Sequence, residues 1–73
     1  MENPVEKKAF IEGNLSKTIH EATRGAVVSL RYMKLHDYDV VLIVFCDGYT
    51  REMRVVGESK WDCMTEIMGV INY

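Results

Sequence analysis

The chain has 73 residues, of which 48% are hydrophobic and 27% are charged, and its formal net charge is −2. This length predicts one domain spanning residues 1–73, and the composition is typical of a folded globular protein, which excludes a disordered chain. The core of so small a domain is thin, which leaves little room for an enclosed catalytic cleft and argues against an enzyme.

The first predicted element is a helix that begins at Pro4, with Asn3 as its N-cap and Glu6 completing a capping-box pattern. Gly25 is the expected left-handed stop of this helix. Phe10 lies nearly opposite the apolar face, so the Glu-Gly-Asn stretch that follows is expected to break or kink the helix and turn Phe10 inward. The apolar face itself consists of Ile11, Leu15, Ile19 and Ala22.

Three polar residues, Glu12, Ser16 and His20, also recur every four positions along this helix. Their order does not fit a catalytic triad, in which a histidine stands between the acid and the nucleophile. We therefore interpret them as a solvated helix face.

Two strands are predicted after the helix. Residues 26–34 alternate in polarity, with Val28, Leu30 and Tyr32 on one side, which is typical of a strand with one wet face. A polar connection leads to Val40–Cys46, which is apolar on both faces. A strand of that kind is usually the central strand of its sheet.

Asp47 and Gly48 lie between two β-rich runs and predict a two-residue hairpin turn of type I′, followed by a returning strand over residues 49–56. This turn would pair Cys46 with Tyr49 and so set the register of the whole hairpin. The helices would then cover the face that holds Val40, Leu42, Val44 and Cys46 together with Tyr49, Met53 and Val55.

The last predicted element is a helix capped by Ser59, with Asp62 three residues further on. The element order αβββα predicts an α+β fold, a two-layer domain in which a three-stranded antiparallel meander carries two helices packed on one face. The apolar stripe of this last helix consists of Trp61, Met64, Ile67, Met68 and Ile71.

On the same register, the sheet face away from the helices presents an apolar stripe with a polar rim, which is typical of a contact surface. We therefore predict a small non-enzymatic protein-interaction or regulatory module. It would bind a protein partner, or a second copy of itself as a homodimer, through this face. The residues that form it are Val41, Ile43 and Phe45 in the middle, flanked by Arg31, Glu52 and Arg54.

The second half of the chain is acidic, because residues 37–73 contain seven Asp and Glu against three Lys and Arg. Glu58, Asp62 and Glu66 recur every four residues on one side of the last helix, and like charges at this spacing are unfavourable for the helix. We interpret them either as a solubility face or as an acidic stripe for a partner with a basic surface. The stripe allows an alternative function by analogy, a small acidic inhibitor of a nucleic-acid-binding enzyme, of the kind that phages and mobile elements encode.

RNA or single-stranded nucleic-acid binding on the sheet face is a further alternative. The order αβββα is also that of double-stranded RNA-binding domains, but the lysine-rich start of their last helix is missing from residues 58–66. An isoelectric point near 5.6 argues against general affinity for phosphate, so nucleic-acid binding is the less favoured alternative. The stacking platform would consist of Arg31, Arg54, Tyr38 and Phe45.

Cys46 and Cys63 are predicted to be reduced, buried thiols with structural roles. Together with His20 and His36 they lack the short paired spacings of a zinc site, so we expect neither a metal nor another cofactor, and no catalytic residue. The longest apolar run is much shorter than the ~20 residues of a membrane span, and the chain does not start with a signal-peptide pattern. We therefore expect a cytoplasmic protein that does not bind membranes.

Overall fold

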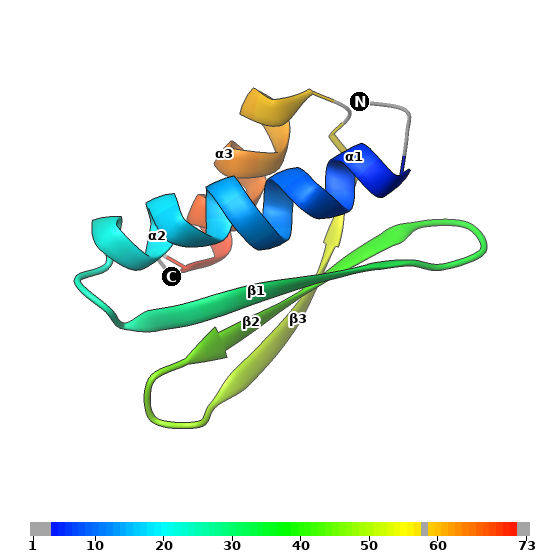
Figure 1. Cartoon of the computed structure of the whole chain (residues 1–73). Coiled ribbons are helices and arrows are strands. Elements are labelled where there is room, and N and C mark those ends of the chain that lie inside the picture. The colour runs from blue at the N-terminus through cyan, green and yellow to red at the C-terminus, as the bar shows by residue number, and fades with distance from the viewer. Residues whose placement is uncertain (1–3, 58, 72–73) are drawn as a thin grey trace.

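The computed structural model describes residues 4–57 and 59–71 and has the element order αβββα. Both helices lie on one face of a three-stranded antiparallel sheet, and no described element covers the other face (Figure 1). The predicted two-layer α+β fold is therefore confirmed. Its elements are α1 (Pro4–Ala9), η1 (Phe10–Leu15), α2 (Ser16–Ala22), β1 (Val27–Lys34), β2 (Asp39–Phe45), β3 (Thr50–Val55) and α3 (Lys60–Ile71).

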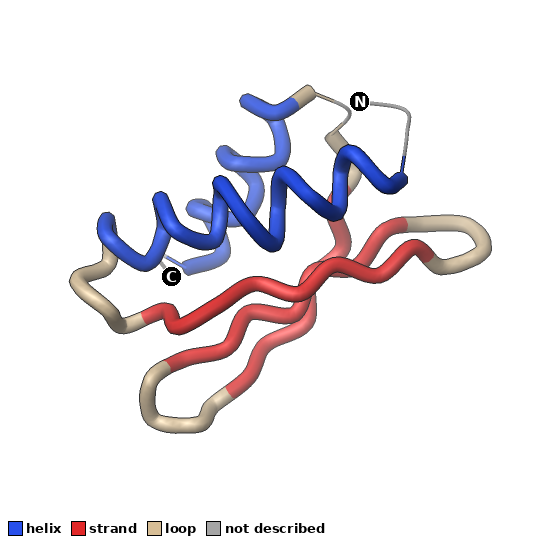
Figure 2. Tube along the Cα trace, in the orientation of Figure 1, coloured by secondary structure: helices blue, strands red, loops and turns tan. Residues whose placement is uncertain are grey.

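The segments α1, η1 and α2 form one continuous N-terminal helix (Figure 2). Its middle part, η1, is a π-helix. The helix begins at Pro4 as predicted, whereas its predicted cap, Asn3, lies outside the described residues. A π-turn holds one more residue than an α-turn, so the predicted kink is a local widening, and Phe10 packs half-buried against the core. Of the predicted apolar face, Ile11, Leu15 and Ile19 are buried and Ala22 is exposed.

The N-terminal helix ends in a Schellman arrangement, as the position of Gly25 predicted. The Gly25 amide donates to the His20 carbonyl at 2.8 Å, and the Arg24 amide donates to the Glu21 carbonyl at 3.1 Å. Both closing residues are left-handed, with φ values of 55° at Arg24 and 84° at Gly25. This turn reverses the chain so that β1 runs back beneath the helix (Figure 1).

The strand β1 contains an irregularity that the alternating sequence did not reveal. Its pairing with β2 shifts between Val27 and Ser29, which indicates a β-bulge at Val28. The bulge places Val27 in the core with no exposed surface and leaves Val28 48% exposed. The predicted inward position of Val28 is therefore wrong, whereas Leu30 and Tyr32 are buried as predicted.

The turn between β2 and β3 also differs from the prediction. The Phe45 amide donates to the Tyr49 carbonyl at 2.8 Å, and the Gly48 amide donates to the Phe45 carbonyl at 3.0 Å. The loop is therefore Cys46, Asp47 and Gly48, one residue longer than predicted. Gly48 is left-handed with φ 88°, whereas Asp47 does not have a positive φ. This combination excludes type I′ and indicates a type I turn that ends in a glycine bulge.

The additional turn residue shifts the hairpin register by one position and inverts the two faces of β2. Val41 and Ile43 have no exposed surface, and Phe45 is half-buried against the same core. The predicted contact surface centred on these three residues is therefore wrong, because they lie beneath the helices. On β3, Met53 and Val55 pack against the core as predicted. The sheet face away from the helices contains instead Val40, Leu42 and Val44 from β2.

The helix α3 starts with the predicted cap. The Ser59 hydroxyl accepts from the Asp62 amide at 3.0 Å, and the Ser59 carbonyl accepts from the Cys63 amide at 3.1 Å. Cys63 and Ile67 are fully buried. Trp61 was predicted to belong to the apolar stripe, but it is 70% exposed, so this prediction is wrong. Within the described residues, no helix combines the length and apolar character needed to cross a bilayer.

Candidate functional site

The open face of the sheet is the surface that no described helix covers (Figure 2). At its centre lies Leu42, which the strand register places between Arg31 on β1 and Glu52 on β3. We use the term open face for nine residues, three from each strand: Ser29, Arg31 and Met33 from β1, Val40, Leu42 and Val44 from β2, and Thr50, Glu52 and Arg54 from β3.

The charged residues of the open face lie where the sequence predicted them, at its rim. Arg31 and Glu52 are exposed, and neither has an ion-pair partner among the described residues. The Arg54 guanidinium lies 4.3 Å from the centre of the Tyr38 ring, a cation–π contact. These two residues and Val40, which is only 4% exposed, line a shallow hollow of about 270 Å³.

The exposed edge of β1 is closed by the N-terminal helix. The Tyr32 amide donates to the Glu12 carboxylate at 2.8 Å, and the Leu30 amide donates to the Ser16 hydroxyl at 3.2 Å. At the other end of the strand, His20 Nδ1 lies 2.8 Å from the carbonyl oxygen of Val27 and donates to it. The interpretation of these residues as a solvated face is therefore wrong for Ser16, which is buried, and for Glu12, which is half-buried, whereas His20 is exposed.

The period of four in these three residues was the signal that sequence reasoning missed. A sheet edge presents alternate backbone groups outward, and a helix beside it offers side chains at i, i+4 and i+8. Edge β3 has no such cover and instead carries Arg51, Glu52 and Arg54, charges that discourage pairing with another strand. Both edges are thus protected, which leaves the open face as the free surface of the sheet.

A buried polar cluster joins α1 to the start of β2, and sequence reasoning missed it entirely. The Lys7 ammonium, 4% exposed, pairs with Asp39 at 2.5 Å and also donates to the Gly57 carbonyl at 3.3 Å. Lys34 approaches the second Asp39 oxygen at 3.3 Å, and the Tyr32 side chain also interacts with this carboxylate and lowers its pKa. Burial alone would raise the pKa of Asp39, but the bonds from Lys7, Tyr32 and Lys34 hold it below its usual value.

The sequence did contain a signal for this cluster. Lys7 lies four residues before Ile11 and continues the stripe of Ile11, Leu15 and Ile19, so its position on a helix is an inward one. Asp39 alternates with Val41 and Ile43 in the same way. A cation and an anion at core-facing positions indicate a buried pair.

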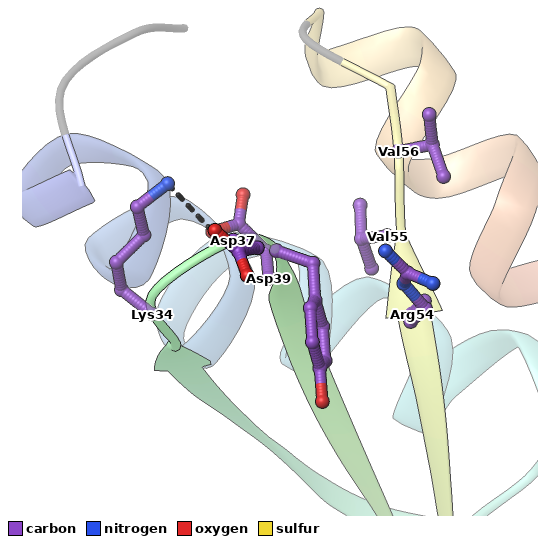
Figure 3. Close-up of a pocket in the computed structure, with 7 residues that line it drawn as sticks. Lys34, Asp37, Asp39, Arg54, Val55 and Val56 are labelled. Atoms are coloured by element: carbon purple, nitrogen blue, oxygen red, sulfur yellow. Dashed lines mark ion pairs between the residues drawn. The ribbon is translucent and has the colours of Figure 1, made fainter.

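A pocket of about 180 Å³ lies beside this cluster, at the end of the sheet where β1 joins β2 (Figure 3). It is smaller than the ~300 to 1,000 Å³ of a typical ligand site. Figure 3 shows Lys34 reaching toward Asp39, with which it pairs, and Arg54 contacts Tyr38. Because these charged groups already have partners, the pocket does not offer a ready site for a small molecule.

The predicted acidic stripe on α3 is reduced to one exposed carboxylate among the described residues. Glu58 lies outside them. The Glu66 carboxylate accepts from the backbone amides of Val56 at 3.1 Å and Gly57 at 2.8 Å, so it ties α3 to the end of β3. Of the two described members of the stripe, only Asp62 is exposed. Glu66 is therefore a structural residue, which weakens the stripe as a docking surface.

The two cysteines are both free thiols, but they differ in exposure. Cys63 is buried as predicted, and burial raises the pKa of its thiol. Cys46 is exposed in the β2–β3 turn, so its predicted burial is wrong. The cause is the shifted hairpin register, which places Cys46 in the turn. In residues 4–57 and 59–71, no three His, Cys, Asp or Glu side chains gather as a group that could hold a metal ion.

Comparison of the chain with protein families, with curated proteins and with solved structures finds no match.

Proposed function

We propose that this protein is a non-enzymatic interaction module that binds another protein chain through the open face of its sheet. The observation that supports this proposal most strongly is the composition of that face. Leu42 and Val44 form a half-buried apolar centre that no described element covers, and the unpaired charges of Arg31 and Glu52 flank it. A dry centre within a charged rim is the usual anatomy of a protein interface.

The physical reason for binding is the apolar surface that remains in water. Full burial of a Leu or Val side chain stabilises by ~1.5 to 3 kcal/mol. Leu42 and Val44 are only half-buried, so part of this free energy is gained only when a partner covers them. Met33, which is 47% exposed, extends the apolar area along β1. The rim charges would contribute orientation and choice of partner more than affinity.

The same geometry argues against an enzyme and against nucleic-acid binding. Against an enzyme, the polar side chains of Glu12, Ser16 and His20 all bond to backbone groups and so have structural roles. For nucleic acid, Arg54 already stacks on Tyr38, and the chain carries a net charge of −2. A cytoplasmic setting with reduced thiols remains part of the proposal.

Site-specific photo-crosslinking in the native host tests this proposal. A photoreactive amino acid at the position of Leu42 should give a protein adduct of discrete mass. The matched control places the same amino acid at Lys17, which is exposed on α2 on the other layer of the molecule. Adducts of equal yield at both positions, or none at Leu42, would show that the open face is not a binding surface.

A further inference from the structure

We infer that the chain that binds the open face is a second copy of this protein, in a symmetric dimer whose two-fold axis runs along β2. This inference rests on the proposed function and names its partner. It is carried by the arrangement of Arg31, Leu42 and Glu52, which lie side by side on three neighbouring strands. A positive charge, an apolar centre and a negative charge in one row can complement themselves.

The symmetry argument follows from the strand order β1-β2-β3. A two-fold axis parallel to β2, above Leu42, stacks two sheets face to face and brings β1 of one copy over β3 of the other. Each Arg31 then faces the partner's Glu52, so two ion pairs flank a contact between the two Leu42 side chains. Two-fold interfaces are isologous, which requires a surface that complements itself in this way.

A second two-fold axis in the plane of the interface would run across the strands, and the charges disfavour it. An axis across the strands would bring Arg31 against the partner's Arg31 and Glu52 against the partner's Glu52. Like charges in contact disfavour that arrangement. Along the chosen axis, Met33 faces the partner's Arg54, whose guanidinium is held against Tyr38 and whose aliphatic stem is available for contact.

The small size of the face limits the strength of the dimer. With a rise of ~3.3 Å per residue and a strand spacing of ~4.8 Å, the flat footprint of the sheet is on the order of 350 Å². A standard interface buries ~800 Å² per partner, so we expect a reversible dimer with a Kd between about 10 µM and 1 mM. Pairing through the sheet edges is the weaker route, because the helix covers β1 and charges line β3.

Charge reversal tests the dimer by sedimentation equilibrium between 10 µM and 1 mM. The wild-type chain should self-associate, and Arg31→Glu or Glu52→Arg alone should each weaken association by about tenfold or more, since either change makes both ion pairs repulsive. The double variant Arg31→Glu/Glu52→Arg should restore the wild-type Kd. Arg51→Glu is the matched control, because Arg51 pairs with the buried Ile43 and therefore lies on the opposite face of the sheet.

Mixing the two single variants provides a second measurement. Each should self-associate more weakly than the wild-type chain, and their mixture should form a heterodimer, with both ion pairs attractive, at the wild-type Kd. A wild-type chain that stays monomeric up to 1 mM would overturn the inference, and so would a double variant that does not regain association. If Leu42 still crosslinks to a different protein in the host, the interaction module stands and only the second copy is wrong. If no adduct forms, both proposals fail.

Discussion

The carboxylate of Glu12 accepts a hydrogen bond of 2.8 Å from the backbone amide of Tyr32, and so joins the π-helix to the outer edge of β1. An edge strand otherwise presents its amides to water or to the strand of another chain. The Ser16 hydroxyl accepts from the Leu30 amide in the same way. The helix therefore provides hydrogen-bond acceptors that a neighbouring strand would otherwise provide on this side of the sheet. Helix and sheet are therefore held together by directional bonds as well as by apolar packing.

Removal of the Glu12 carboxylate should loosen this edge. We expect Glu12→Ala to lower the free energy of unfolding by about 1 to 2 kcal/mol, because the Tyr32 amide loses its acceptor in a partly buried position. Glu12→Gln retains an acceptor oxygen and should lose less. Glu21→Ala is the matched control, since Glu21 is exposed on the same helix. Hydrogen exchange at the Tyr32 amide reports the effect, and an exchange rate equal to that of the control would contradict it.

The buried pair of Lys7 and Asp39 should make stability depend on pH in the acid range. The pKa of Asp39 is lower in the folded chain than its ordinary value of 3.8, so near that pH the unfolded chain binds more protons. The contribution of Asp39 is therefore present above about pH 5 and is lost as the pH falls through its folded pKa. Urea unfolding between pH 3 and pH 7 measures this dependence.

The variant Asp39→Asn isolates the contribution of this carboxylate. At pH 7 it should cost about 3 kcal/mol or more, because the Lys7 ammonium is left buried with its charge uncompensated. The gap between wild type and variant should narrow as the pH decreases. Two unfolding curves that stay parallel down to pH 3 would show that Asp39 does not titrate in the way its surroundings indicate.

The outcome for β2 shows which part of this fold the sequence could specify. The strand was predictable because its run of apolar residues is long, but the choice of face depended on one turn. Asp47-Gly48 fits a two-residue type I′ turn and equally a three-residue loop that ends in a left-handed glycine. Because the side-chain period of a strand is two, that single residue put Val41 and Ile43 on the wrong side in the prediction, and Cys46 in the strand instead of the turn.

The partners in the polar contacts were harder to assign from the sequence for a different reason. Ser59 was recognised as a cap because its partner, the Asp62 amide, is three residues away. Lys7 and Asp39 are separated by 32 positions, and Glu12 and Tyr32 by 20 positions, so only the packed fold brings them together. The rim charges Glu52 and Arg54 were placed correctly because β3 kept its predicted faces, and Arg31 because β1 keeps its alternation beyond the bulge at Val28.

The two cysteines should react very differently with a thiol reagent. Cys46 is exposed in the turn and should be modified rapidly at neutral pH, whereas Cys63 has no exposed surface and should react only when the chain unfolds. The variant Cys46→Ser leaves Cys63 as the one thiol and serves as the control. Rapid modification of that variant without denaturant would show that α3 does not pack against the core as described.

Cys63 should also lower stability at alkaline pH. Its folded pKa is raised by burial, so above about pH 8.5 the unfolded thiol loses its proton first and the folded chain binds more protons. The free energy of unfolding should therefore decrease as the pH rises beyond that value, and Cys63→Ala should reduce this decrease. The comparison requires unfolding curves of both chains at pH 7 and pH 9.5.

Glu66 and Asp62 provide the last comparison, because the two carboxylates share one side of α3 but only one of them is engaged. Glu66 accepts from the Val56 and Gly57 amides, and the approach is close: a side-chain carbon added at Gly57 would lie 2.3 Å from the β-carbon of Asp62. We expect Glu66→Ala to cost about 1 to 2 kcal/mol, since two backbone donors lose their acceptor. Asp62→Asn should change stability by no more than about 0.5 kcal/mol, because Asp62 is exposed.

Thermal and urea unfolding of the two variants separates a structural role from a solubility role. Glu66→Gln is the informative intermediate, because it keeps one acceptor oxygen while removing the charge. If it retains most of the stability that Glu66→Ala loses, hydrogen bonding to the end of β3 explains the position of Glu66. If Glu66→Ala and Asp62→Asn are equally harmless, the side of α3 that carries them is a solvated acidic face, and the junction between β3 and α3 depends on Gly57 and on the bond that its carbonyl accepts from Lys7.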